Sequence, residues 1–459
     1  MRTYLTSFIV SFLFVLVTTP FLIKIGIKHG FVDKVDQRKI HQGVIPRIGG
    51  IGIAMGTLFP LFLLYFYNNF VSQTLFGSIE NVVVIIFGGL SISILGLFDD
   101  IKGLPAKFKF LFQIALAVIA IYCGFSINAM STPWGVVQLG WVGHFITVLW
   151  IVGIINAFNL IDGMDGLSSG VSFFACITIM SLSIVNGYMF VALVSAALAG
   201  AVVGFLVYNF NPAKIFMGDA GSMFIGYVLA VLSLKNQSKG HTIVSMLVPI
   251  IAMGLPILDT TLAFLRRFLR NQSIFSADKQ HIHHILLSKG LNQRKVVFML
   301  YGISVVFTAL AMLLIFQKDV EAFLVIVVFS IVVFVIVSKL GYTEMFYSRF
   351  KTRKEDRLEN HLENYLVEKI TIQNYNEMFD VLPISGFEIL DCEGKRIALG
   401  GTSGGVHFFD IAAEKNKIVR LYWVSSVPTI NNREAAMLLV LAKSIVKNSF
   451  FSIQENDIK

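Results

Sequence analysis

Long stretches of apolar residues recur along the first 340 residues of the chain, and short polar segments separate them. An α-helix rises about 1.5 Å per residue, so about 20 apolar residues cross a hydrocarbon core of about 30 Å. The apolar residues are continuous rather than alternating, which predicts helices and not the strands of a barrel. We expect eleven transmembrane helices, near residues 4–23, 48–67, 80–98, 107–124, 143–160, 167–185, 188–207, 221–236, 242–264, 296–316 and 320–338.

The polar connections alternate in charge along the chain. Residues 24–47, 99–109 and 266–295 are rich in Lys and Arg, whereas residues 68–79 and 125–142 contain neither. Cytoplasmic connections of membrane proteins carry the excess of positive charge. We therefore expect the basic connections in the cytoplasm and the N-terminus outside. An odd number of spans then leaves the C-terminal residues in the cytoplasm as well.

The composition changes near Gly341, where charged residues become frequent and short apolar runs alternate with glycine-rich turns. This change predicts a transmembrane domain over residues 1–340 and a cytoplasmic extension over residues 341–459, whose role the sequence leaves open. The predicted fold class is an all-α polytopic membrane protein of about eleven transmembrane helices with a small C-terminal cytoplasmic α+β-like domain.

The bulk composition agrees with a lipid environment. Only 14% of the residues are charged and 56% are hydrophobic, with a mean hydropathy of +0.75, whereas soluble proteins carry about 25% charged residues. The placement of charge matters more than its sum in a membrane protein, so the net charge of +9 does not predict a nucleic-acid partner. The three cysteines are widely spaced and predict neither a disulfide framework nor a metal site.

Apart from Glu80, Asp319 and Glu321, the acidic residues of the apolar part gather at the predicted cytoplasmic side of its helices. An ionisable group at membrane depth is costly and tends to be functional. A single aspartate at a helix end is often an N-cap, but two adjacent carboxylates repel each other unless a cation or a proton lies between them. The six aspartates at this face are Asp99, Asp100, Asp162, Asp165, Asp219 and Asp259.

Oxygen ligands from several helices at one face predict a Mg²⁺ site. The Asp99–Asp100 pair, Asn159 and Asp219 supply such oxygens. Mg²⁺ takes one or two carboxylates, keeps several waters and completes its shell with substrate phosphates. Mn²⁺, which accepts the same ligands, is an alternative.

Cationic residues lie in the same connections. Lys109 follows the acid pair, and Lys39, His41 and Arg47 lie in the first cytoplasmic connection. The spacing of the histidines at 281, 283 and 284 could suit zinc, but cysteine partners are absent and the carboxylates favour a hard cation. Histidines near Arg and Lys are a better match for holding a diphosphate.

Five motifs, in this order, resemble the polyprenyl-phosphate N-acetylhexosamine-1-phosphate transferase superfamily, of the glycosyltransferase family 4 type. The resemblance covers roughly residues 20–300. The second and fifth motifs are similar to the branch that uses UDP-N-acetylglucosamine or related amino sugars. The motifs are Arg38–His41 with Pro46–Gly50, Asp99–Gln113, Asn156–Leu167, Phe216–Asp219 and His281–His284.

The resemblance implies an enzyme that transfers N-acetylhexosamine-1-phosphate, in this branch N-acetylglucosamine-1-phosphate, from a UDP-amino sugar to undecaprenyl phosphate. UMP would be released, and the lipid product would begin a lipid-linked glycan of the cell envelope. The implied location is the bacterial cytoplasmic (inner) membrane, with the active site on the cytoplasmic side. The amino sugar, the prenyl length and a homodimer stay open.

The resemblance also implies roles for single residues. Asp219 and Asn159 would hold Mg²⁺, while Asp165 and Phe216 would meet the uracil. The implied catalytic residues are Asp99, Asp100, Asp162 and Lys109. The other implied substrate-binding residues are His281, His283, His284, Arg47, His41 and Lys39.

Joining two phosphates brings two anions together, so catalysis needs charge neutralisation and alignment more than a covalent helper. We expect direct attack in one step, with a covalent aspartyl-phosphate as the alternative mechanism. Two other functions stay open at this point: the same chemistry on a muramyl-pentapeptide precursor, and a cation-coupled transporter with carboxylates near the bilayer midplane.

Overall fold

The computed structural model of the chain forms two compact units, Met1–Ile336 and Val337–Lys459. The structure describes residues 2–32, 45–66, 72–73, 76–132, 135–235, 243–269, 281–316, 319–340, 384–390, 396–401, 407–413 and 417–423.

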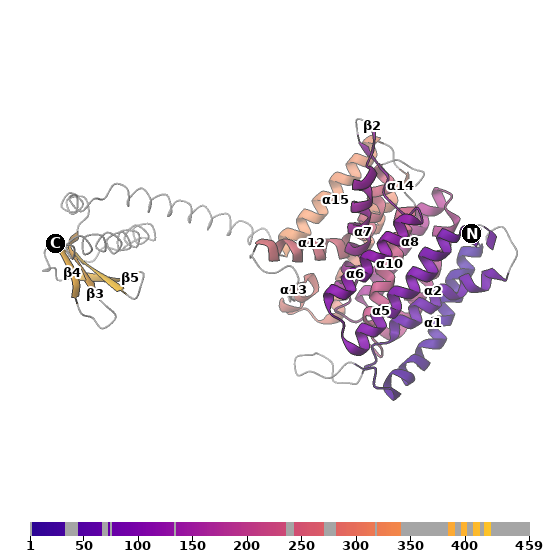
Figure 1. The fold of residues 1–459 in the computed structure, drawn as a ribbon, viewed down its shortest axis with the longest axis horizontal. Coiled ribbons are helices and arrows are strands. Elements are labelled where there is room, and N and C mark those ends of the chain that lie inside the picture. Colours follow the sequence, from indigo (N-terminus) through magenta and orange to yellow (C-terminus); the bar gives the residue numbers. More distant parts are fainter. Residues whose placement is uncertain are drawn as a thin grey trace. The chain divides into compact units, whose positions relative to one another are not determined.

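The first unit is built from helices (Figure 1). The longer ones are α1 (Arg2–Lys28), α2 (Gly49–Tyr65), α5 (Gly89–Lys102), α6 (Ala106–Tyr122), α7 (Gly140–Ile161), α8 (Leu167–Val185), α9 (Met189–Asn209), α10 (Gly218–Lys235), α11 (Ile243–Ala252), α12 (Gly254–Leu269) and α14 (Gln293–Phe316). The last helix, α15 (Asp319–Lys339), ends three residues beyond the boundary of this unit. The short ones are α4 (Ile79–Val82), the π-helix η1 (Val83–Gly88) and α13 (Ile282–Ser288). A hairpin of β1 (Ala129–Thr132) and β2 (Gly135–Gln138) precedes α7.

Six helical segments of the described chain are long and apolar enough to cross a membrane. The unit is therefore mainly helical and has the architecture of a multi-pass membrane protein. The full set of eleven spans stays a prediction. The six are Arg2–Lys28, Ile79–Lys102, Gly140–Ile161, Leu167–Val185, Met189–Asn209 and Gln293–Phe316.

Several predicted helices differ in detail from the structure; for example, α1 continues to Lys28 and α10 already begins at Gly218. The predicted helix 242–264 is divided at Met253 into α11 and α12, since Pro256 has no N–H for the carbonyl of Ala252. The predicted helix 80–98 continues to Lys102. The acid pair Asp99–Asp100 therefore lies on the last turn of α5, which fixes the direction of both side chains.

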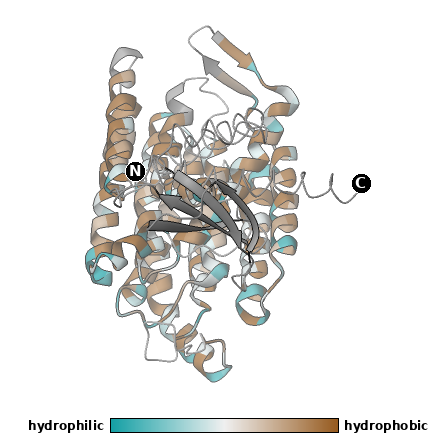
Figure 2. Ribbon diagram, turned by 90° about the vertical axis from the view of Figure 1, so that its left-hand side faces the viewer, coloured by the Kyte–Doolittle hydropathy of each residue, from teal (hydrophilic) through white to brown (hydrophobic). Residues whose placement is uncertain are grey.

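α1 and α9 illustrate how the helices are sorted between lipid and protein. In α1, Ser11, Val15 and Thr19 repeat every four residues and are buried, whereas Leu13 and Val17 between them are exposed. In α9, Gly200 and Gly204 leave so little room that a Cβ would lie 2.1 and 2.7 Å from carbonyl oxygens of α1. Small residues four apart let two membrane helices approach closely, and apolar colour runs along the helices in Figure 2.

α10 is the central helix of this unit and is buried along nearly its whole length. It packs against α2, α5 and α7. Glycines make the approach possible: a Cβ at Gly96 of α5 would lie 2.4 Å from the backbone nitrogen of Ala220, and one at Gly50 of α2 would lie 2.0 Å from that of Gly221. The first turn of α10 is thus fixed against two other helices by close backbone packing.

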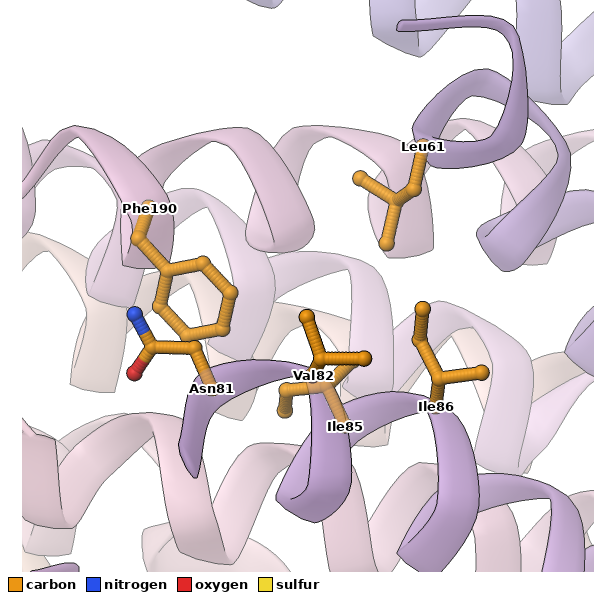
Figure 3. Close-up of a pocket in the computed structure, with 6 residues that line it drawn as sticks. All are labelled: Leu61, Asn81, Val82, Ile85, Ile86 and Phe190. Carbon is orange, nitrogen blue, oxygen red and sulfur yellow. The ribbon is translucent and has the colours of Figure 1, made fainter. Parts of the chain in front are cut away.

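The π-helix η1 has a local cause. The buried hydroxyl of Tyr227, in α10, donates a hydrogen bond to the carbonyl of Val84 (3.0 Å) and lies where a side chain at Gly88 would be. A side chain inserted into the hydrogen-bond ladder changes the winding of a helix. A small pocket beside η1 is lined mainly by apolar side chains (Figure 3), namely Leu61, Asn81, Val82, Ile85, Ile86 and Phe190.

This pocket is remote from the acid pair. Asn81 and Asp100 lie on one continuous helical segment, Ile79–Lys102, and are separated along its axis by roughly 28 Å at about 1.5 Å per residue. The predicted chemistry therefore belongs to the other end of the helices.

The second unit contains an antiparallel sheet. Its strands are β3 (Ile384–Leu390), β4 (Arg396–Gly401), β5 (His407–Ala413) and β6 (Lys417–Trp423), in the spatial order β4-β3-β6-β5. The α+β character of the whole extension stays a prediction, because residues 341–383 and 424–459 lie outside the described residues.

Candidate active site

Lys109 joins two carboxylates that are far apart in the sequence. Its ammonium nitrogen lies 2.7 Å from Oδ2 of Asp99 and 3.0 Å from Oδ2 of Asp219. The turn between α5 and α6 makes this possible, and the backbone N–H of Leu104 donates to Oδ1 of Asp99 at 2.6 Å. The three charged side chains are 13–24% exposed, so water still reaches the cluster.

Asp100 has a different partner from its neighbour. Its two carboxylate oxygens accept the backbone N–H groups of Asp219 (3.0 Å) and Ala220 (3.1 Å), at the positive N-terminal end of α10. The repulsion expected within the acid pair is therefore relieved separately for each member, by Lys109 for Asp99 and by a helix N-terminus for Asp100. The pair need not share one cation.

Gly218 allows this contact between Asp100 and α10. Its φ of +68° is in the left-handed region, and a Cβ would lie 2.4 Å from both Oδ2 of Asp100 and the carbonyl oxygen of Arg47. The glycine of the Phe216–Asp219 motif is thus required by both conformation and space.

We expect Gly218→Ala to destabilise the protein by at least about 1–2 kcal/mol, because alanine is strained at positive φ and its methyl group displaces Asp100. Thermal unfolding in detergent measures this. Gly302→Ala is the matched control, since a Cβ at Gly302 in α14 meets no atom within 4 Å. Equal melting temperatures for the two variants would contradict the account of Gly218.

α7 brings the third motif to the same place. A Cβ at Gly226 of α10 would lie 2.7 Å from the Cα of Ile155 in α7. α7 ends, and α10 begins, at the site, so the two helices run in opposite directions from this contact. Asn159 and Asp162 are therefore one and two turns closer to the first turn of α10, which carries Asp219.

Asp162, just after α7, belongs to the same group of charges. Burial raises the pKa of its carboxyl well above the usual range. The neighbouring carboxylates of Asp219 and Asp100 raise that pKa further, whereas the guanidinium of Arg47 lowers it. Asp162 therefore lies within electrostatic range of Asp219, Asp100 and Arg47.

Backbone hydrogen bonds join the first and fourth motifs. The N–H of Phe216 donates to the carbonyl of Pro46 (2.8 Å), the N–H of Gly49 to that of Phe216 (3.0 Å), and the N–H of Gly50 to that of Met217 (2.8 Å). Two motifs some 170 residues apart therefore form one small piece of backbone, which fixes the half-buried ring of Phe216.

Asp165 is only 3% exposed. Its Oδ2 accepts hydrogen bonds from the side-chain amide of Asn211 (2.9 Å) and from the backbone N–H of Ala213 (3.1 Å). The carboxylate therefore holds the segment that leads to Phe216, in addition to any contact it makes with a substrate.

The histidine segment lies against the third motif. His283 is 2% exposed, and its Nε2 lies 2.6 Å from the position of a Cβ on Gly163, next to Asp162. Burial lowers the pKa of His283 to about 4, and His284 beside it acts in the same direction. His283 is therefore neutral at pH 7. The expectation that it holds a diphosphate as a cation is not supported, because the site desolvates the charged form.

The predicted residues Lys39 and His41 lie outside the described residues. Among the residues that are described, no group of three or more His, Cys, Asp or Glu side chains is arranged to hold a metal ion. The carboxylate of Asp219, the predicted metal ligand, forms an ion pair with Lys109.

The comparisons with known proteins agree with these motifs. The model of the family "Glycosyl transferase family 4" matches residues 82–237. A probable undecaprenyl-phosphate N-acetylglucosaminyl 1-phosphate transferase of Bacillus subtilis (strain 168) is 41% identical over 310 residues, which are 67% of this chain and 84% of the relative. The chain belongs to glycosyl transferase family 4.

Other relatives in glycosyl transferase family 4 are more distant. The decaprenyl-phosphate N-acetylglucosaminephosphotransferase of Mycobacterium leprae (strain TN) is 33% identical, over 58% of this chain and 72% of the relative. The undecaprenyl-phosphate alpha-N-acetylglucosaminyl 1-phosphate transferase of Escherichia coli (strain K12) is 29% identical, over 72% of this chain and 89% of the relative. The resemblance inferred from the five motifs is confirmed, and these names favour neither the muramyl-pentapeptide nor the transporter alternative.

Two residues of this family member's site cannot be recognised from the sequence alone. They are Asn211, which bonds Asp165, and Asp259, which bonds His281. Their partners, Asp165 and His281, are 46 and 22 residues away in the sequence, so only the fold reveals them.

Proposed function

We propose that the chain transfers N-acetylglucosamine-1-phosphate from UDP-N-acetylglucosamine to undecaprenyl phosphate, with release of UMP. The observation that carries this proposal is the ion pair of Lys109 with Asp99 and Asp219, at the point where four motifs of the family converge. The names of the relatives, which are transferases of N-acetylglucosamine 1-phosphate to undecaprenyl phosphate, support this choice of substrates. The product would begin a lipid-linked glycan of the cell envelope.

The reaction is a displacement at phosphorus. An oxygen of the lipid phosphate attacks the β-phosphorus of the nucleotide sugar and forms a new P–O bond, while the bond from that phosphorus to the bridging oxygen breaks and UMP leaves. Both reactants are anions, so the site must supply positive charge and hold them in line. Lys109 and Arg47 supply fixed positive charge in this proposal.

The contacts of the acid pair support direct attack rather than an aspartyl-phosphate. Both oxygens of Asp99 are engaged, one by Leu104 and one by Lys109, and both oxygens of Asp100 cap α10. A nucleophilic carboxylate would have to give up one of these bonds first. We therefore propose that Asp99 positions the ammonium group of Lys109 and that Asp100 holds the N-terminus of α10, rather than that either attacks phosphorus.

Asp219 and Asn159 would hold Mg²⁺ or Mn²⁺ when the substrate is present. One carboxylate, the amide oxygen of Asn159 and the substrate phosphates are the hard oxygen ligands that such ions prefer. The ion would neutralise the diphosphate. Lys109, which now pairs with Asp219, would be free to contact a phosphate instead.

Phe216 and Asp165 are proposed to bind the uracil, through stacking and through a hydrogen bond. We expect Phe216→Ala to raise the KM for the UDP-sugar about tenfold, because stacking of one base on an aromatic ring contributes about 1–3 kcal/mol. Steady-state kinetics measure it. Phe87→Ala, which removes an exposed phenylalanine of η1, is the control. An unchanged KM for Phe216→Ala rules out the stacking role.

The membrane setting suits the lipid substrate. Large apolar side chains beside the acid pair and Lys109 are exposed, so a prenyl tail can lie along them while its phosphate reaches the charges. They are Phe98, Ile101, Phe108 and Leu111. We propose eleven spans in the bacterial inner membrane, with this site and the extension 341–459 in the cytoplasm, as the basic connections favour.

Purified protein with Mg²⁺ and undecaprenyl phosphate tests the substrate assignment. UDP-N-acetylglucosamine and UDP-muramyl-pentapeptide are offered separately, and the lipid product is identified by mass. We expect a product from the first only. A product from the second alone identifies the muramyl-pentapeptide activity, and uptake of a solute by proteoliposomes without any lipid product identifies a transporter.

A further inference from the structure

Asp259 is a buried carboxylate that the proposed reaction does not use. It lies in α12 and is 2% exposed. Its Oδ2 lies 2.9 Å from Nδ1 of His281, and its Oδ1 accepts the backbone N–H of Ile282 at 2.7 Å. One carboxylate thus holds both the ring of His281 and the first residue of α13. Burying such a group is costly unless it is paired in this way.

The contact fixes the proton of His281. A carboxylate only accepts hydrogen bonds, so Nδ1 of His281 must carry the hydrogen that lies between the two atoms. His281, which is itself 5% exposed, cannot turn its ring without breaking this bond. The ring orientation is therefore determined from α12.

The ring of His281 in turn lies beside the ring of His283. The two rings are nearly parallel, with centroids 5.8 Å apart and an angle of 5° between their planes. Nε2 of His283 has no hydrogen-bond partner among the described residues, although it is buried. It points to Gly163, beside Asp162. An unpartnered buried nitrogen at this position is free to bind a ligand.

We propose that Asp259 is a positioning residue, which holds His281 and the start of α13 so that Nε2 of His283 makes one hydrogen bond to a polar oxygen of the nucleotide sugar. This inference rests on the proposed function. It assigns different tasks to the histidines, since His281 orients and His283 contacts the substrate.

Asp259→Asn tests the inference with little change of shape. The amide oxygen can still accept the N–H of Ile282, but the amide N–H₂ would face Nδ1 of His281, which must then give up its hydrogen. We expect kcat/KM for UDP-N-acetylglucosamine to fall at least tenfold, with the melting temperature close to that of the wild type. Thr260→Val, which removes an adjacent hydroxyl that has no partner in the described chain, is the matched control and should keep wild-type activity.

A double-mutant cycle separates positioning from a general loss of structure. If Asp259 acts through His281, then Asp259→Asn in a His281→Ala background should cause no further loss. His281→Asn, whose amide can donate to Asp259 as Nδ1 does, should keep more activity than His281→Ala. If Asp259→Asn does not fold, the comparison of His281→Asn with His281→Ala tests the inference in its place.

Wild-type kcat/KM in Asp259→Asn, losses that multiply in the double variant, or equal activities of His281→Asn and His281→Ala would each overturn the inference. Failure of the proposed function looks different, because the wild-type protein itself would then form no lipid product.

Discussion

Asp219→Ala is expected to lower kcat by about 10²–10³-fold or more, the loss typical for one preorganised electrostatic group in an active site. Asp219 is the carboxylate that pairs with Lys109 and that we propose as the ligand of Mg²⁺. Its removal leaves the diphosphate without its ion and Lys109 without one of its two partners. The fold should persist, because the backbone N–H of residue 219 still donates to Asp100.

Release of UMP by the purified variants, at several Mg²⁺ concentrations, measures this effect. Glu80→Gln is the matched control, since Glu80 is an exposed carboxylate at the opposite end of the helical segment that carries Asp99. Near-normal turnover of Asp219→Ala in Mg²⁺ would rule out its role as a ligand.

Lys109→Met is expected to lower kcat by a similar factor, about 10²–10³. Methionine keeps the length of the side chain but removes the charge that lies 2.7 Å from Asp99 and 3.0 Å from Asp219. Two partly buried carboxylates would then repel each other and the incoming phosphates. The KM for the UDP-sugar should change less than kcat, because the charge matters most where the two phosphates meet.

Lys107→Met is the control for this variant, because Lys107 lies two residues earlier on the same helix and is exposed. Equal kinetic constants for the two variants would contradict a specific role of Lys109. Loss of activity in both would point to a general effect of positive charge at this membrane surface.

The sequence predicted the neighbourhood of the site, because its information is carried by composition along single helices. Apolar stretches bounded by aspartates and basic residues are enough to place Asp99, Asp219 and the histidines at one face. The same pattern does not predict which of these side chains form ion pairs or hydrogen bonds with each other. Asp99 pairs with Lys109, while Asp100 accepts the backbone N–H of Asp219, which lies 119 residues further along. Both contacts depend on the close packing of α5 on α10 at Gly96.

Burial is the second property that the sequence could not give. The three histidines suggest a cationic loop when read as a motif, but the fold buries His283, and desolvation then lowers its pKa to about 4. Asp165 likewise reads as a free carboxylate, whereas the fold surrounds it and gives it Asn211 as a partner. Both effects arise from segments that are remote in sequence.

The fate of the β-phosphorus tests the central claim most directly. The purified protein is incubated with Mg²⁺, undecaprenyl phosphate and UDP-N-acetylglucosamine that carries ³²P at the β-position only. If the charged cluster joins two phosphates, the label enters the lipid fraction, one unlabelled UMP is released for each labelled lipid, and both signals are lost in Asp219→Ala. Label that stays in UDP while the sugar alone enters the lipid, or a lipid fraction that never becomes labelled, would contradict the account.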